Sequence, residues 1–223
     1  MPGPSSSCRH GCMNARDRAP QGDVRPPRRR TRGRLAPLSR QFFSRPTLRV
    51  ARDLLGHFLV HDTPQGRLVG RIVEVEAYRG PTDPASHAFR RTARSQIMWG
   101  RPGTAYVYFT YGSHFCMNVV TEPEGKAGAI LLRAVEPVGG TEVMRRNRGV
   151  HDDRLLASGP GRLTQAFGVG RAHNGVDLGH PPLYLARGRT ARVPVRTGPR
   201  IGIRVAVARP WRFYIPDHPC LSR

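Results

Sequence analysis

Two glutamates and a tyrosine alternate with apolar residues in the clearest extended segment of the sequence. Residues 68–78 read Leu-Val-Gly-Arg-Ile-Val-Glu-Val-Glu-Ala-Tyr, and a two-residue period places Glu74, Glu76 and Tyr78 on one face. A carboxylate on a rigid strand can orient and deprotonate water, which is the chemistry that hydrolysis of a glycosidic bond requires. The alternative is that both glutamates form ordinary surface ion pairs, and the periodicity leaves both interpretations open.

Aromatic side chains follow this segment at short intervals: Tyr78, His87, Tyr106, Tyr108 and Tyr111. Flat rings can form the walls of a slot for a nucleobase, which stacks on them. Tyr106 fits a strand core equally well. Tyr111 occupies the predicted tip of a hairpin, where its ring either fills a gap in a base stack or packs on a neighbouring loop.

The charge balance favours a polyanionic partner. The chain of 223 residues holds 37 Lys and Arg against 15 Asp and Glu, a formal net charge of +22. Phosphate backbone is the commonest partner for such an excess, although an arginine-rich composition from a GC-rich genome would give the same count. Lys126 is the only lysine, and it lies in a turn. Because strand-nicking glycosylases use an amine to form a Schiff base, a glycosylase of this composition should leave the abasic site intact.

The cysteines and the hydropathy pattern give three further expectations. Cys8, His10 and Cys12 are close in sequence, but no second ligand pair accompanies them, so we expect no metal. No apolar run approaches 18 residues, and no signal-peptide pattern is present. We therefore expect a cytoplasmic protein that does not bind a membrane.

The positioning elements predict a mixed α/β (α+β) fold. Residues 1–34 are rich in Arg and Pro and are expected to be a disordered tail, which either touches DNA phosphates or has no role in binding. Residues 35–223 are expected to form one domain around a curved antiparallel sheet with a protruding hairpin. The patterns predict helices over 46–55, 141–148 and 160–167, and strands over 57–61, 68–78, 104–110, 114–120, 129–135, 183–186, 201–207 and 212–215. Residues 79–103 are expected to be a long loop, which in a compact domain is usually functional or disordered.

Five ordered segments resemble the alkyladenine (3-methyladenine) DNA glycosylase family. They are residues 70–78 (Gly-Arg-Ile-Val-Glu-Val-Glu-Ala-Tyr), 102–118 (beginning Pro-Gly-Thr-Ala-Tyr-Val-Tyr), 131–137 (Leu-Leu-Arg-Ala-Val-Glu-Pro), 158–161 (Ser-Gly-Pro-Gly) and 210–214 (Pro-Trp-Arg-Phe-Tyr). The resemblance runs from about Leu35 to the C-terminus. Segment 89–99 departs from the family pattern, which bears on loop conformation and substrate range but not on the reaction.

The resemblance implies a role for each matching residue. Glu76 would activate the attacking water, and Arg133 would help hold that water together with a backbone carbonyl near Ile203. Tyr78 would stack on one face of a flipped purine, with His87 and Tyr108 on the other. Asn118 would crowd the 2-amino group of normal guanine, and Tyr111 would intercalate.

The resemblance further implies a monofunctional enzyme of base-excision repair, active as a monomer without cofactor or metal. Its substrates would be alkylated purines or hypoxanthine in double-stranded DNA, and it would associate with the bacterial nucleoid. Two rivals from other classes remain. A non-enzymatic nucleic-acid-binding protein would not need Glu76, and a nuclease using Glu74, Glu76 and Asp83 would need a divalent ion.

Overall fold

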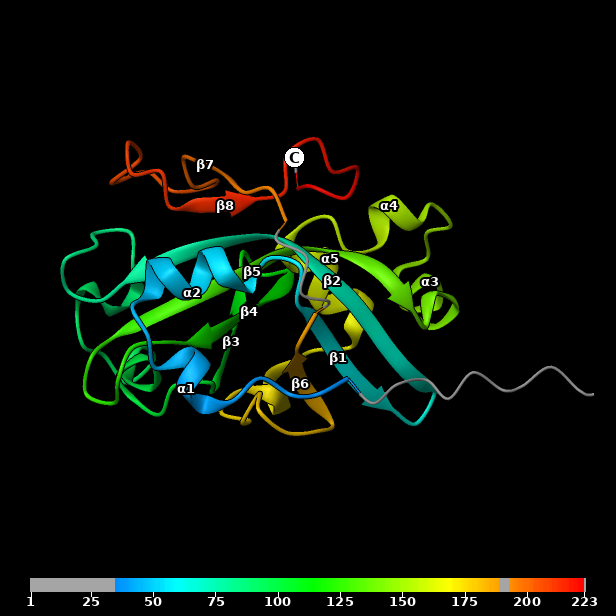
Figure 1. Cartoon of the computed structure of the whole chain (residues 1–223), viewed down its shortest axis with the longest axis horizontal. Helices are drawn as coiled ribbons and strands as arrows, with labels where there is room; N and C mark the ends of the chain where they lie inside the picture. Colours follow the sequence, from blue (N-terminus) through cyan, green and yellow to red (C-terminus); the bar gives the residue numbers. More distant parts are fainter. Residues whose placement is uncertain (1–34, 189–192, 223) are drawn as a thin grey trace, which may run out of the picture. The chain divides into compact units, whose positions relative to one another are not determined.

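The computed structural model describes residues 35–188 and 193–222. The expected tail, with Cys8, His10 and Cys12, lies outside the described residues. The described part is a single mixed α/β domain in which a curved antiparallel sheet is accompanied by short helices (Figure 1). The predicted fold class is thereby confirmed.

The sheet is built from eight strands, and β2 lies at its centre. The strands are β1 (Phe58–Thr63), β2 (Gly66–Arg79), β3 (Ala105–Thr110), β4 (His114–Val120), β5 (Gly128–Gly139), β6 (Leu183–Ala186), β7 (Arg196–Gly198) and β8 (Arg212–Tyr214). Their order is β3-β4-β5-β2-β1-β6, while β8 pairs with both β2 and β7. β1 pairs with β2 only as far as Arg71, and β8 takes over that edge from Glu74 to Glu76.

Short helices and turns complete the domain. They are α1 (Arg40–Phe43), α2 (Thr47–Leu54), α3 (Thr141–Arg148), α4 (Asp153–Leu156), α5 (Pro160–Phe167) and the 3₁₀ turns η1 (His87–Phe89), η2 (Gln96–Trp99) and η3 (Arg171–His173). α3, α5 and β6 have the predicted bounds. α5 begins with a proline at its first turn, and Gly168 in the left-handed conformation caps its C-terminus. α1, α4 and β7 are too short to give a periodic signal and were not predicted.

The strand predicted over 201–207 is wrong. Residues Ile201, Ile203, Val205 and Val207 alternate with other residues as in a strand, but the segment is an irregular loop. Gly202 and Ala206 have φ angles of +78° and +52°, which interrupt an extended chain. Val205 and Val207 are 50 % and 52 % exposed, so the apolar alternation here does not reflect burial.

A β-bulge in β2 changes which residues of this long strand face the core. Register shifts occur between Ile72 and Glu74 and between Glu74 and Val75. Leu68 and Ile72 before the bulge and Val75 after it all belong to the main hydrophobic core. Because side chains alternate along a strand, the extra residue reverses which parity faces the core, and the glutamates then point to the other side.

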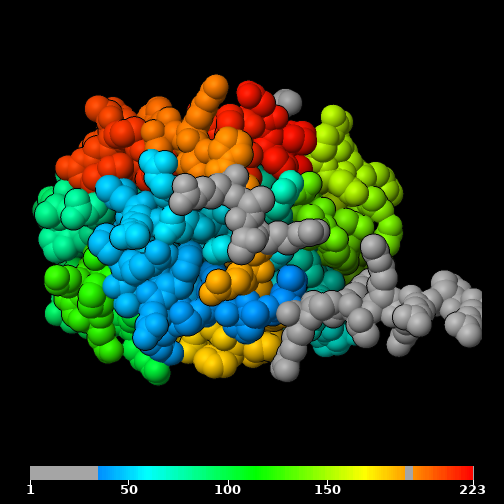
Figure 2. Space-filling model, viewed as in Figure 1, coloured from blue at the N-terminus to red at the C-terminus, as the bar shows by residue number. Residues whose placement is uncertain are grey.

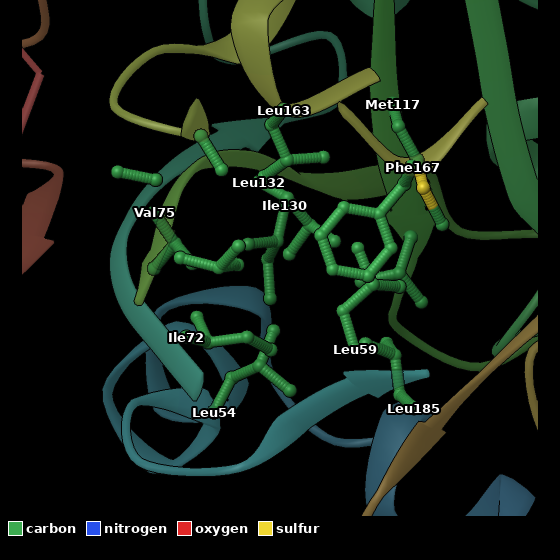
Figure 3. Packing of buried hydrophobic residues seen from close by; sticks show 14 of the residues in the cluster. Leu54, Leu59, Ile72, Val75, Met117, Ile130, Leu132, Leu163, Phe167 and Leu185 are labelled. Atoms are coloured by element: carbon green, nitrogen blue, oxygen red, sulfur yellow. The ribbon is translucent and has the colours of Figure 1, made fainter. Parts of the chain in front are cut away.

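The main core lies between the sheet and two helices. Leu54 of α2 and Phe167 of α5 converge with Ile72, Ile130 and Leu132 of the central strands (Figure 3). In Figure 2 the residues of α1 and α2, in blue, form the left and central part of this face, and the segment 193–222, in orange and red, runs along the top. Within the described ranges, none of the helices is long and apolar enough to cross a membrane.

Candidate active site

A pocket of about 340 Å³ opens on the side of the sheet opposite the main core. Its walls come from the end of β2, the loop before β3, the β3–β4 hairpin, β5 and the loop after β7. Six of the seven predicted site residues line it: Tyr78, His87, Tyr108, Tyr111, Asn118 and Arg133. The seventh, Glu76, is fully buried and lies immediately behind Tyr78, Arg133 and Ile201 of the pocket wall, which all contact it.

The carboxylate of Glu76 is held from three directions. The phenol of Tyr78 donates to Oε2 at 2.8 Å, and the backbone N–H of Ile201 donates to Oε1 at 2.7 Å. Nη1 of Arg133 lies 3.3 Å from Oε1. A buried carboxylate needs such partners to remain charged, and their geometry fixes both of its oxygens.

Arg133 is in turn fixed by Glu74. Its Nε lies 3.2 Å from Oε1 of Glu74, and both Nε and Nη2 donate to Oγ of Ser222. Glu74 is fully buried and also accepts from Arg212 at 2.7 Å and from the N–H of Ser222 at 2.6 Å. The two glutamates therefore have different environments: Glu74 belongs to a closed ionic network, and Glu76 lies next to the pocket.

Aromatic rings form two walls of the pocket. His87 on η1 lies with its ring centroid 4.7 Å from that of Tyr108, and its Nδ1 is 2.9 Å from the hydroxyl of Tyr106. Partial burial and the charge of Arg94 lower the pKa of His87 to about 4, so its ring is neutral at neutral pH. Burial, together with Glu76, raises the pKa of Tyr78, and burial raises that of Tyr108, so both remain neutral phenols.

The floor and the rim of the pocket come from the β3–β4 hairpin. Asn118 of β4 is buried and donates from Nδ2 to the carbonyl of Tyr106 at 3.1 Å, which orients its amide. Tyr111 at the tip is 80 % exposed and has a φ of +51°. Its ring lies 5.9 Å from that of His114, so the packing alternative for this tip residue is only partly realised.

The structure adds pocket contacts that sequence reasoning missed. The backbone N–H of Ile201 donates to Glu76, and the hydroxyl of Ser222 donates to Glu74. Neither residue type indicates such a role in the sequence. The guanidinium of Arg94 lies 4.7 Å from the ring centroid of Tyr108 and was visible in sequence only as one of several loop arginines. Cys116 also lines the pocket, and burial raises the pKa of its thiol to about 11, so it is protonated at neutral pH.

The family of the chain follows from comparison with known proteins. A model of the family described as "Methylpurine-DNA glycosylase (MPG)" matches residues 41–219. This range contains every predicted site residue. The chain belongs to this family. The protein is therefore a DNA glycosylase of the 3-methyladenine type, and its substrate is DNA.

Bacterial relatives agree with this assignment. The chain is 51 % identical over 195 residues to a protein of Streptomyces avermitilis named "Putative 3-methyladenine DNA glycosylase", covering 83 % of this chain and 91 % of that protein. Proteins with the same name from Prosthecochloris aestuarii and Chlorobium phaeobacteroides are 49 % and 46 % identical, over 82 % and 81 % of this chain and 90 % and 92 % of theirs. The matches span nearly the whole length of these relatives.

Proposed function

We propose that the protein flips alkylated purines of the 3-methyladenine type, or hypoxanthine, out of duplex DNA and hydrolyses their N-glycosidic bond. The observation that carries this proposal is the placement of Glu76, a fully buried carboxylate held by three donors directly behind an aromatic pocket. The lesion would leave as the free base, and the product would be an intact abasic site.

Glu76 acts as the general base in this proposal. It orients the water that attacks the anomeric carbon and accepts a proton from it, as a carboxylate does in inverting glycoside hydrolysis. Arg133 helps to hold that water together with a backbone carbonyl near Ile203, a residue that lines the pocket. The negative charge of Glu76 also stabilises the oxocarbenium-like sugar that forms as the bond breaks.

The base is recognised by stacking and by shape. Tyr78 covers one face of the base, and His87 with Tyr108 covers the other; this stacking offsets the cost of the stacking lost from the duplex. A neutral His87 imposes no repulsion on a base that carries the positive charge of an alkylated purine. Asn118 on the floor crowds the 2-amino group of guanine, and Tyr111 fills the gap in the duplex.

The reaction would stop at the abasic site because, among the residues that the structure describes, none that lines the pocket carries an amine. Lys126 is exposed in the turn between β4 and β5 and does not line the pocket. We further propose that the enzyme works as a monomer in the cytoplasm, bound to the nucleoid, since its pocket is complete within one chain and its substrate is chromosomal DNA.

The test is cleavage of a duplex that carries one hypoxanthine, or one 3-methyladenine-type lesion, in buffer with EDTA. Samples are read with and without hot alkali, for the wild type and Glu76→Gln. We expect strand breaks only after alkali, and a loss of about 10²- to 10⁴-fold in rate for Glu76→Gln, the usual contribution of a general base. DNA binding by the variant should persist, because Gln is nearly isosteric.

Two outcomes would contradict the proposal. Strand breaks without alkali would indicate a lyase, and strand breaks that appear only when EDTA is replaced by a divalent ion would indicate a nuclease. Bound DNA without cleavage of any damaged purine would support the non-enzymatic binding protein. A matched control is Glu142→Gln on α3, a carboxylate paired with Arg145 away from the pocket, which should leave the rate unchanged.

A further inference from the structure

We infer that the buried ion pair between Asp83 and Arg200 is a positioning device for the reaction, because it ties the loop after β2 and the segment that carries Ile201 to the end of β2, next to Glu76. This inference rests on the proposed function. Asp83 lies on the loop after β2, and Arg200 lies on the segment between β7 and β8 and contacts Ala77 near the end of β2. Neither residue lines the pocket itself.

The pair is bidentate and sealed from solvent. Nη1 and Nη2 of Arg200 donate to the two carboxylate oxygens of Asp83 at 2.6 and 2.8 Å, and both side chains are 0 % exposed. Nη1 also donates to the carbonyl of Ala77 at 3.0 Å, which ties the pair to β2. Asp83 accepts from the N–H groups of Arg79 and Ala85, so it also shapes the loop that leads to His87.

Arg200 supports the Tyr78 side of the pocket. Its guanidinium lies 4.7 Å from the ring centroid of Tyr78 and 5.2 Å from that of Trp211, so the cation is flanked by two aromatic rings. A cation over an aromatic face is attractive and planar stacking restricts the ring. One face of Tyr78 is thus occupied, and a base in the pocket must meet the other.

Arg200 also fixes the position of residues 201–203, which follow it directly in the chain. Ile201 follows it directly and donates its N–H to Glu76 at 2.7 Å, and residues 201–203 line the pocket. This segment is an irregular loop with Gly202 in the left-handed region, so no sheet pairing holds it there. The ion pair supplies the anchor that a strand would otherwise give.

A purely structural role explains this arrangement less well. Burying two charges costs desolvation energy, and a well-packed apolar pair often stabilises a fold equally well. Nε of Arg200 is also buried without a hydrogen-bond partner among the described residues, a further cost. An apolar pair could not provide the directional contacts that Arg200 makes with the carbonyl of Ala77 and the ring of Tyr78.

The first test compares excision rates under single-turnover conditions for the wild type, Arg200→Lys and Asp83→Asn. Arg200→Lys keeps the charge but loses the planar, two-pronged contact. We expect the maximal rate to fall about 10- to 100-fold, as small misplacements of reacting groups do, while the enzyme concentration for half-maximal rate changes far less. Arg145→Lys is the matched control, since Arg145 forms a bidentate pair with Asp153 remote from the pocket.

The second test is amide hydrogen exchange of Ile201, which does not depend on activity. Its exchange should accelerate about 10-fold or more in Arg200→Lys through local opening, while the amides of the β1–β6 pairing stay protected. Should Arg200→Lys not fold, Asp83→Asn carries both tests. A maximal rate and an Ile201 exchange equal to those of the Arg145→Lys control would overturn the inference. A wild type without glycosylase activity would overturn the proposed function alone, and the exchange result would then decide the inference.

Discussion

At the scale of single residues, His87 shows how a local environment selects a protonation state. The ring is packed among tyrosines, and Arg94 lies above Tyr108 at the same wall. Partial burial and then the charge of Arg94 lower its pKa from 6.5 to about 4. A neutral ring is the form that tolerates a positively charged base beside it, and burial together with the charge of Arg94 favours this form.

We predict that His87 titrates with a midpoint of about 4, measured by NMR on its Cε1 proton. Because the pKa is lowered on folding, the unfolded chain binds the proton first as the pH falls. The folded state therefore loses stability as the pH falls from 6.5 to about 4. Above pH 6.5 the titration of His87 does not change the free energy of unfolding.

Replacing Arg94 by Ala should raise the pKa of His87 but leave it below 6.5, because burial is the larger cause. The matched control is Arg91→Ala, an arginine on the same loop that stacks on Trp99 instead. A midpoint near 6.5 in the wild type, or an equal shift in the control, would contradict this prediction.

At the scale of elements, the β3–β4 hairpin combines a fixed base with a free tip. Asn118 pairs with both Tyr106 and Leu131 in register, so the base of the hairpin is part of the sheet. Phe109 packs on Phe115 with centroids 5.1 Å apart, while Tyr111 beyond it is 80 % exposed. A large exposed ring on a rigid support is suited to enter a base stack without loss of order elsewhere.

We predict that Tyr111→Ser lowers excision from duplex DNA by about 10-fold or more, because base extrusion costs a few kcal/mol that the inserted ring offsets. The free energy of unfolding should change by less than about 0.5 kcal/mol, as for other exposed positions. Activity on the same lesion in single-stranded DNA should fall much less. Phe109→Ser on the same hairpin is the control, and an equal loss in both variants would indicate damage to the hairpin instead of loss of a wedge.

At the scale of the whole molecule, the net charge of +22 suits an enzyme that acts on DNA, because basic side chains attract the phosphate backbone. Each phosphate contact releases counterions from the DNA. The logarithm of the binding constant should therefore fall with the logarithm of the salt concentration, at a slope of about −0.9 per contact. Arginines that contact no DNA are explained by the composition of a GC-rich genome. The slope of binding against salt gives the number of arginines that do contact phosphates.

We predict that a chain lacking residues 1–34 keeps the maximal single-turnover rate of the full chain, because the pocket lining and the three groups that hold the Glu76 carboxylate lie within residues 78–203. Binding to undamaged DNA should weaken if the nine arginines of this segment contact phosphates. Excision rates at saturating enzyme and salt-dependent binding, measured on both chains, separate these effects. A lower maximal rate in the shortened chain would place part of the site in residues 1–34.

Sequence alone determined the elements whose signals are local. Two-residue periodicity predicted the side of β2 that carries Glu74, Glu76 and Tyr78, and α5 has the bounds predicted for it. The hairpin followed from its turn residues. These patterns depend on neighbours along the chain, which a sequence displays directly.

Only the tertiary structure decided what separates the two glutamates and what holds the catalytic candidate. Arg133, Arg212 and Ser222 enclose Glu74, and Ile201 reaches Glu76 across a sequence separation of 125 residues. The alternating apolar pattern of 201–207 predicted a strand because hydropathy cannot show that no neighbouring strand is present to bury it. The bulge in β2 had a signal, the change of apolar parity after Ile72, but its consequence depends on β5 and β8 pairing with opposite edges of the same strand. Contacts between distant segments arise from chain topology, and topology is a property of the folded state.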